Sequence, residues 1–460
     1  MHNNNIPVRI LLILPDGKIH KLKLPFIDIS FREAPLTATM LAALTPAHIP
    51  AHITIADESV DRIPFNRPFD LVGISCLTGT SIRAYEIADQ FRQSNITVIL
   101  GGVHATLMPE EAAKHADAVV IGDGDLSWGQ LLEDFSNNRL KPVYKSKDTL
   151  VDNLPIPRRD LQKRFGYAIP NTVSATQGCR KICDFCTVPA LKKGWHTRPI
   201  NQVLTDIKSI KAKRFVFNDV NLTEDTLYAK TLLRELIPLK KKWGGLATSA
   251  ILDDEELLEL FRESGCSYLL IGFESFNRKS LSSINKQFNH VTRYKELVER
   301  LHAMHIIVHG CFIFGFDDDD KHVFQNTVDM VNELKIDIPR YALYTPYPGT
   351  RAFNRLDAEN RLLHKDWQFY DTQHVVFKPA AMSPQELDKG FKWAFRKTYS
   401  MGSSMRRTLR MDPNTPIAFL GNLAYKLYIR RLERETHRFP AECSPSVTTG
   451  NLGHEEGRAA

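Results

Sequence analysis

The first 140 residues alternate between short apolar runs and longer segments in which apolar residues recur every three or four positions. Such runs predict strands, and the longer segments predict amphipathic helices. Strands are expected at residues 8–14, 52–56, 71–77, 97–100 and 118–121, and helices at 36–44, 82–93, 110–115 and 126–135. Alternation at these lengths predicts an α/β fold with a doubly wound, Rossmann-like parallel sheet.

The alternation resumes near residue 172 with longer units. Strands are expected at residues 172–176, 214–218, 245–249, 268–273, 307–314 and 341–344, and helices at 200–211, 227–239, 253–264, 291–305 and 322–334. Six such units predict a partial, TIM-like (β/α)6 barrel. Functional residues of barrels lie at the carboxyl ends of the strands.

The remaining segments set the domain boundaries. Residues 141–167 contain three prolines and little periodicity, which predicts a surface linker between domains at 1–140 and 168–378. Ser383-Pro-Gln-Glu386 has the pattern of a capping box. We expect a helix over 387–399 to cover the open side of the barrel, within a helical region at 379–438. The composition of 439–460 predicts a disordered tail.

Composition narrows the class of protein. The chain has 460 residues, of which 43% are hydrophobic and 25% charged, as in a globular protein of two or three domains. No apolar run is long enough to span a bilayer, and the amino terminus does not resemble a signal peptide. Seven unevenly spread cysteines predict a reducing, cytoplasmic location rather than a disulfide framework.

The net charge and the distribution of basic residues say little about binding partners. The net charge of +7 is mild, and no concentrated basic patch with interleaved aromatic residues lies outside the tail, so we expect no nucleic-acid partner. Residues 405–410 and 417–434 combine apolar residues with several arginines. A basic amphipathic helix can make peripheral contact with an anionic membrane. A helix that docks on its own protein and exposes a basic face is the favoured alternative.

Three cysteines lie within eight residues, directly after a predicted strand. Cys179, Cys183 and Cys186 have the spacing C-x3-C-x2-C. Soft thiolates bind iron–sulfur clusters, and three ligands on a [4Fe–4S] cluster leave one iron open to a small molecule. A structural zinc site is an alternative, although His196 lacks the paired spacing that such sites have. Chance clustering of buried cysteines is another.

This motif resembles that of the radical S-adenosylmethionine (SAM) enzymes. The resemblance implies that the open iron chelates SAM and that one electron, from a donor such as flavodoxin or ferredoxin, cleaves it to a 5'-deoxyadenosyl radical. It also implies SAM contacts at the barrel strand ends, from Phe185, Asn218, Asp219, Asn221, Glu274, Ser275, Gly315 and Thr345. Each of these strand-end segments, taken alone, is explained equally well as a turn or a helix cap. Cys266 and Cys311 are interpreted as buried apolar residues, and a second cluster is not expected.

The first sheet carries small residues at its strand ends. Ser75-Cys-Leu77 and Gly101-Gly102 resemble the S-x-L and G-G motifs of cobalamin-binding domains. The implied cobalamin contacts are Ser75, Leu77, Thr78, Gly101, Gly102, His104 and Gly122. The alternative is that these glycines serve only tight turns.

The cobalt-binding D-x-H-x-x-G motif of some such domains is absent. Asp16 and His20 follow the first strand with the wrong spacing. The identity of the lower axial ligand of cobalt is therefore undetermined, with His104 and His20 as candidates. A solvated role for such a loop histidine is the more usual interpretation.

Together the two resemblances imply a cobalamin-dependent radical SAM enzyme, most often a C-methyltransferase. In the family's scheme one SAM methylates cob(I)alamin, and a substrate radical then takes the methyl group from methylcobalamin. Trp367-x-x-Tyr370-Asp371-x-x-His374 resembles relatives that act on hopanoids, other isoprenoid lipids or tetrapyrroles. Alternatives are cyclisation or rearrangement, radical SAM chemistry without cobalamin, and a non-catalytic metal-stabilised binding module. The sequence identifies no catalytic side chain.

Overall fold

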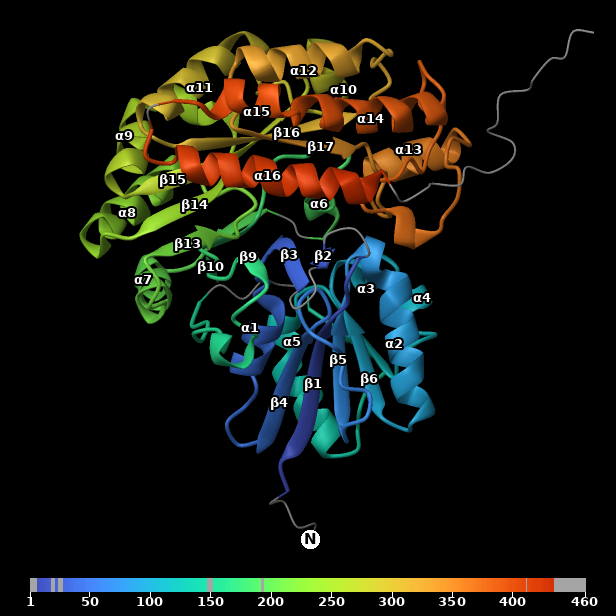
Figure 1. The fold of residues 1–460 in the computed structure, drawn as a ribbon. Helices are drawn as coiled ribbons and strands as arrows, with labels where there is room; N and C mark the ends of the chain where they lie inside the picture. Colours follow the sequence, from blue (N-terminus) through green and yellow to red (C-terminus); the bar gives the residue numbers. More distant parts are fainter. Residues whose placement is uncertain are drawn as a thin grey trace, which may run out of the picture.

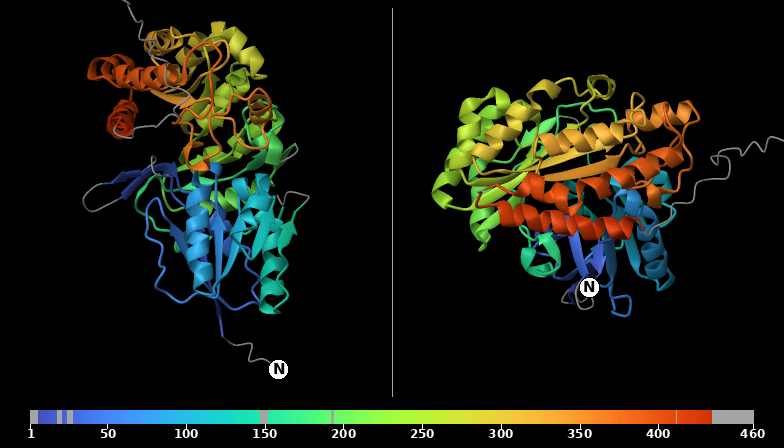
Figure 2. Two further views of the ribbon diagram at one scale, coloured as in Figure 1. Left: turned by 90° about the vertical axis from the view of Figure 1, so that its right-hand side faces the viewer. Right: turned by 45° about the horizontal axis from the view of Figure 1, so that its top comes forward.

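The computed structural model describes residues 6–17, 21–23, 28–146, 152–191, 194–410 and 412–433. His20 and the predicted tail lie outside these residues. Two α/β units are stacked, the first with the amino-terminal sheet and the second with the other parallel sheet and most of the helices (Figure 1; Figure 2). The predicted α/β class, with one parallel sheet followed by another, is confirmed.

The first unit is a parallel sheet of six strands in the order β4-β1-β5-β6-β7-β8. Its strands are β1 (Val8–Leu14), β4 (Ala51–Asp57), β5 (Leu71–Ser75), β6 (Thr97–Gly101), β7 (Ala118–Ile121) and β8 (Val143–Lys145). β8 lies in the segment that was expected to be a linker. It could not be predicted, because a strand of three residues beside Pro142 is too short to show periodicity.

Helices cover both faces of this sheet, as the doubly wound pattern predicts. Helices α1 (Thr37–Ala43) and α5 (Gly124–Ser136) pack on one face, where Trp128 joins Ile10 and Leu12. Helices α2 (Ser81–Gln93), α3 (Val103–Leu107) and α4 (Pro109–Ala112) lie on the other face. Side chains of a strand alternate between faces, so neighbouring residues of β1 contribute to two separate cores.

The second unit is a parallel sheet in the order β10-β13-β14-β15-β16-β17. Its strands are β10 (Thr172–Val173), β13 (Arg214–Phe217), β14 (Lys242–Ala247), β15 (Cys266–Glu274), β16 (Ile307–Phe314) and β17 (Ile338–Leu343). The outer helices are α7 (Ile200–Ser209), α8 (Thr226–Leu236), α9 (Glu255–Glu263), α10 (Arg278–Ser283), α11 (Tyr294–Ala303) and α12 (Val323–Glu333). The order of the sheet leaves β10 and β17 as its two edges, which is the expected partial barrel.

Two small sheets tie distant segments together. Strands β2 (Lys21–Lys23), β3 (Asp28–Glu33) and β9 (Tyr167–Ile169) form one of them, so the segment between β1 and β4 is paired with the chain that follows the first unit. Strands β11 (Thr176–Gly178) and β12 (Trp195–Thr197) form an antiparallel pair on either side of the cysteine motif. Neither sheet is predicted by the pattern of the sequence.

The carboxyl-terminal region is helical, with α13 (Arg351–Ala358), α14 (Pro384–Thr398), α15 (Met401–Thr408) and α16 (Thr415–Leu432). The predicted capping box starts α14, since Ser383 and Glu386 each accept a hydrogen bond from the other's backbone. Phe395 of α14 packs on Tyr341 of β17 with ring centroids 5.0 Å apart. α14 therefore extends the outer helical layer.

The open edge of the barrel at β17 is covered by α16 as well as by α14. Gly421 approaches Ile338 of β17 so closely that a Cβ there would lie 2.8 Å from its Cδ1 atom. Tyr428, Ile429 and Leu432 bury the inner face of the helix, in agreement with the docked alternative. In the part of the chain that the structure describes, no helix combines the length and apolar character needed to cross a bilayer.

Candidate active site

The cysteine motif lies in a loop between β11 and β12, beside the start of the barrel. Gly178 has φ +83°, and a Cβ at this position would collide with the Gly194 carbonyl. The Cys179 amide donates a hydrogen bond of 3.1 Å to the same carbonyl. A glycine before the first cysteine therefore lets the loop turn tightly against its partner strand.

Asp219, predicted to bind SAM, instead holds the start of this loop. Its carboxylate is 1% exposed and accepts hydrogen bonds from the backbone amides of Ala175 and Thr176 and from the Thr176 hydroxyl. Burial raises the pKa of Asp219 to about 6, although these hydrogen bonds oppose the rise. The prediction of a direct SAM contact is not supported, because the Asp219 carboxylate already accepts hydrogen bonds from backbone amides.

The three cysteine thiols are near enough for their charges to affect one another. Burial raises the pKa of each, and that of Cys183 to about 12. Thiolates here need nearby positive charge, which the irons of a [4Fe–4S] cluster supply. Within the described ranges no group of three or more His, Cys, Asp or Glu side chains is arranged to hold a single metal ion.

Polar residues after β13 border the first cysteine. Asn221 donates a hydrogen bond to Glu224, and the Glu224 carboxylate lies 3.8 Å from the Cys179 sulfur. Asn218 lines the cavity described below. Glu224 could not be predicted from the sequence, because an acidic residue in a polar loop has no distinguishing pattern.

The end of β15 forms a buried ion pair. Glu274 has φ +63°, unusual for a residue with a side chain, and the strand register shifts between Gly272 and Glu274. Lys286 lies 2.6 Å from the Glu274 carboxylate, and Asn289 donates to the Gly272 and Phe273 carbonyls. The strand end is thus held by contacts from beyond the strand, and Lys286 carried no recognisable signal.

Other predicted SAM residues support the ends of β15, β16 and β17. Ser275 accepts a hydrogen bond from the Asn277 amide, and Thr345 donates one to the Leu343 carbonyl. Gly315 has φ +102°, and a Cβ there would lie 3.0 Å from Leu387, in the core rather than in the cavity. Phe185 packs edge-on against Tyr344 with ring centroids 6.4 Å apart.

The predicted cobalamin motifs meet at the strand ends of the first unit. Gly102 has φ +91°, and a Cβ there would lie 2.7 Å from Ser75 Oγ and 2.8 Å from the Cys76 amide nitrogen. Gly101 accepts a hydrogen bond of 3.1 Å from that amide. The two motifs are therefore in direct contact, and only glycine fits at position 102.

Two further residues of this group have structural roles. Gly122 has φ +86° and donates its amide to Thr106. His104 is 0% exposed, with Thr78 Oγ1 3.4 Å from Nδ1 and Glu111 Oε1 3.3 Å from Nε2. The solvated interpretation of His104 is therefore wrong. The prediction that it binds cobalt is also unsupported, because both ring nitrogens are engaged.

The His104 contacts extend to the second unit. Glu111 also accepts a hydrogen bond of 3.0 Å from the Trp367 indole, and the Trp367 and His104 rings have centroids 5.6 Å apart. The Trp367-x-x-Tyr370 segment therefore docks on the first unit beside the predicted cobalamin site.

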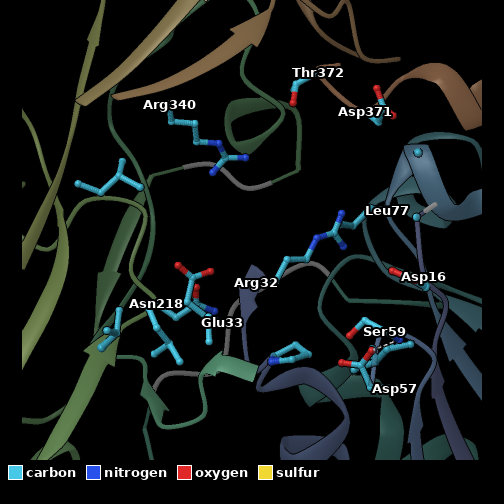
Figure 3. Close-up of a pocket in the computed structure, with 18 of the residues that line it drawn as sticks. Asp16, Arg32, Glu33, Asp57, Ser59, Leu77, Asn218, Arg340, Asp371 and Thr372 are labelled. Carbon is cyan, nitrogen blue, oxygen red and sulfur yellow. Dashed lines mark hydrogen bonds between the residues drawn. The ribbon is translucent and has the colours of Figure 1, made fainter. Parts of the chain in front are cut away.

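A cavity of about 2120 Å³ lies between the two units (Figure 3). Ser75, Leu77 and Thr78 line it from the first unit, and Leu77 is 48% exposed. Asn218 and Arg340 line it from the barrel. Pockets for one small ligand are usually about 300–1,000 Å³, so this cavity has room for more than one ligand.

We expect Gly102→Val to weaken corrin retention roughly tenfold or more, because the new side chain strains the backbone and displaces the Ser75–Leu77 turn. The measurement is corrin absorbance after reconstitution with hydroxocobalamin and gel filtration. Cluster absorbance should be unchanged. Gly402→Val is the matched control, since nothing lies within 4 Å of a Cβ there. Equal corrin content in the Gly102→Val variant and the parent would contradict the assignment.

Fold and site together define a protein whose barrel carries a three-cysteine motif and whose first sheet carries small residues at its strand ends. The model of the radical SAM superfamily matches residues 173–331, and that of the B12 binding domain matches residues 8–131. The chain belongs to the radical SAM enzymes that carry a B12 binding domain. Its cofactors are a [4Fe–4S] cluster, SAM and cobalamin.

Relatives match over nearly the whole chain. Bacteriochlorophyllide d C-12(1)-methyltransferase of Chlorobaculum tepidum is 31% identical over 443 residues, 93% of this chain and 94% of the relative. Bacteriochlorophyllide d C-8(2)-methyltransferase of the same organism is 29% identical, over 88% and 95% of the two chains. The solved structure of the radical SAM methyltransferase TsrM from Kitasatospora setae, with cobalamin and a [4Fe–4S] cluster bound, has the same fold. It aligns with a TM-score of 0.63 at 15% identity, covering 93% of this chain and 100% of that one.

Proposed function

We propose that this enzyme transfers a methyl group from SAM to a carbon atom of a tetrapyrrole. The full-length similarity to the bacteriochlorophyllide d C-12(1)-methyltransferase is the observation that carries the proposal. The volume of the cavity supports it, because a flat macrocycle must fit there together with the cofactors. Of the substrate classes that the sequence suggested, isoprenoid lipids are thus the second choice.

The cluster supplies the electron that cleaves SAM, and cobalamin supplies the methyl-transfer chemistry. Cys179, Cys183 and Cys186 would hold the cluster. Asp219 keeps their loop in place through the Ala175 and Thr176 amides.

The chain also positions the other ligands. The Glu274–Lys286 pair fixes the strand end at which SAM would bind. The Ser75–Leu77 turn would border the corrin on the opposite side of the cavity. The protein's part is to hold these ligands close together and shielded from water.

The test is an anaerobic reaction of the cluster- and cobalamin-loaded enzyme with bacteriochlorophyllide d, a reductant and SAM labelled in its methyl group. We expect a pigment heavier by one labelled methyl group, together with 5'-deoxyadenosine. Mass spectrometry measures both products. Formation of 5'-deoxyadenosine with an unmethylated, rearranged pigment would instead indicate a cyclase. No turnover of the pigment, but methylation of an isoprenoid lipid, would overturn the choice of substrate class.

A further inference from the structure

Arg340 brings a positive charge into the interior of the barrel. It lies on β17, and its Cα pairs in register with that of Cys311 on β16. Figure 3 shows its guanidinium extending into the cavity. Among the described residues, its side chain makes no hydrogen bond or ion pair, although the group carries five N–H donors.

Charged side chains surround Arg340 without forming an ion pair with it among the described residues. Glu33 is near enough for its charge to act on Arg340, but no ion pair joins them in the described part of the chain. Arg32, on the same strand as Glu33, is a second guanidinium lining the cavity (Figure 3). Both arginines lower the pKa of Tyr347, which burial raises overall. These two cations share the region with two carboxylates, those of Glu33 and Asp371, and among the described residues neither carboxylate forms an ion pair with Arg340.

The wall beside Arg340 is aromatic. Tyr268 and Tyr425 line the cavity, and their hydroxyls contact the two ring nitrogens of His309. Burial lowers the pKa of His309 to about 3, so this ring is neutral at physiological pH. Because the two tyrosine hydroxyls and the His309 nitrogens contact one another, this wall presents mainly aromatic ring faces to a ligand. Arg340 is a charged hydrogen-bond donor beside it.

A ligand that fills the cavity removes the water around this guanidinium. An ion that is desolvated without a partner is strongly unfavourable, whereas a guanidinium–carboxylate pair with two parallel hydrogen bonds is among the strongest polar contacts. A ligand that fits this wall should therefore combine a flat apolar body with an anionic group.

We propose that Arg340 binds a carboxylate of the substrate and thereby sets its orientation. This inference rests on the proposed function and specifies that the pigment is bound as an acid rather than as an ester. Arg340 lies three residues before the end of β17 at Leu343, about 10 Å along the strand. The carboxylate would then point into the barrel, and the opposite edge of the substrate would face the strand ends where SAM is cleaved.

The test compares the binding of matched acids and esters to the cluster- and cobalamin-loaded enzyme, without turnover. The first pair is bacteriochlorophyllide d with a free propionate and its methyl ester. The second pair is pyrenebutyrate and its methyl ester, a flat carboxylate that is not a tetrapyrrole. Fluorescence titration gives each Kd. We expect each acid to bind roughly tenfold or more tightly than its ester.

Three variants assign the preference to a residue. Arg340→Met should abolish it, whereas Arg340→Lys should keep part of it, because an ammonium keeps the charge but not the paired donors. Arg32→Met is the matched control, and should keep the full preference. Iron and corrin contents are measured for every variant.

The outcomes separate this inference from the proposed function. Equal binding of acid and ester, or a preference lost only in Arg32→Met, would overturn the role of Arg340 and leave the tetrapyrrole proposal intact. If only the pyrene pair binds, with a preference that depends on Arg340, the carboxylate site stands and the tetrapyrrole proposal fails. Loss of corrin from Arg340→Met would mean that Arg340 serves the cofactor, and would also overturn the inference.

Discussion

The Cys183→Ala variant is expected to lose the brown colour of the cluster and to form no 5'-deoxyadenosine. A cluster left with two protein thiolates lacks a ligand that the other described cysteines cannot replace, because they lie in strand or loop positions outside this motif. Without the cluster no electron reaches SAM. Absorbance of the anaerobically reconstituted protein and chromatography of the SAM products measure the two losses.

Cys266→Ala is the matched control for this experiment. Cys266 is 4% exposed at the beginning of β15, the end opposite to Glu274. Removing its sulfur should cost about 1 kcal/mol of stability through lost packing, with iron content and SAM cleavage unchanged. Retained SAM cleavage in Cys183→Ala would refute the assignment of the cluster, whereas a loss in both variants would indicate a general folding defect.

The second large effect is expected for Asp206→Leu. The Asp206 carboxylate is 0% exposed and lies between two guanidiniums, 2.7 Å from Arg159 and 3.3 Å from Arg198. The leucine would leave Arg198, itself 2% exposed, as an uncompensated buried charge. Losing one partner of a buried ion pair costs ~3–5 kcal/mol. We therefore expect a fall in the thermal unfolding temperature on the order of 10 °C.

The same change should also impair the cluster. Arg198 donates to the Ser174 carbonyl and Arg159 to the Thr172 carbonyl, just before the cysteine loop. Tryptophan fluorescence measures the unfolding, and iron analysis measures the occupancy of the site. Glu255→Ala is the control, because it removes an ion pair whose glutamate side chain is 76% exposed, which is worth ~1 kcal/mol or less. An unfolding temperature of Asp206→Leu within the range of that control would contradict the argument.

Long, buried elements could be predicted from the sequence, and short or bridging ones could not. The apolar runs of β1 and β16 predicted those strands with their observed bounds, because both are buried along most of their length. β9 pairs with β3 across more than 130 residues, and no local pattern records such pairing. α16 was predicted as a helix, but its place at the open barrel edge depends on the packing of Gly421 against Ile338.

The residues of the candidate site likewise divide into those that could be predicted from the sequence and those that could not. The cysteine spacing is a local pattern with a chemical reason and needed no structure to be recognised. A carboxylate after a strand is ambiguous, because it can face a ligand or bind backbone amides, and Asp219 does the latter. Lys286 and Arg340 belong to elements that reach the site only in the folded chain.

The contact between Trp367 and Glu111 bears on how the enzyme works through a reaction cycle. Together with the pairing of β3 and β9, it fastens the corrin-binding sheet to the barrel on two sides. A domain attached in this way has little freedom to move between separate positions relative to the barrel. We therefore expect successive reactants to enter and leave one shared chamber, and the order of their arrival, rather than a domain rotation, to set the pace of turnover.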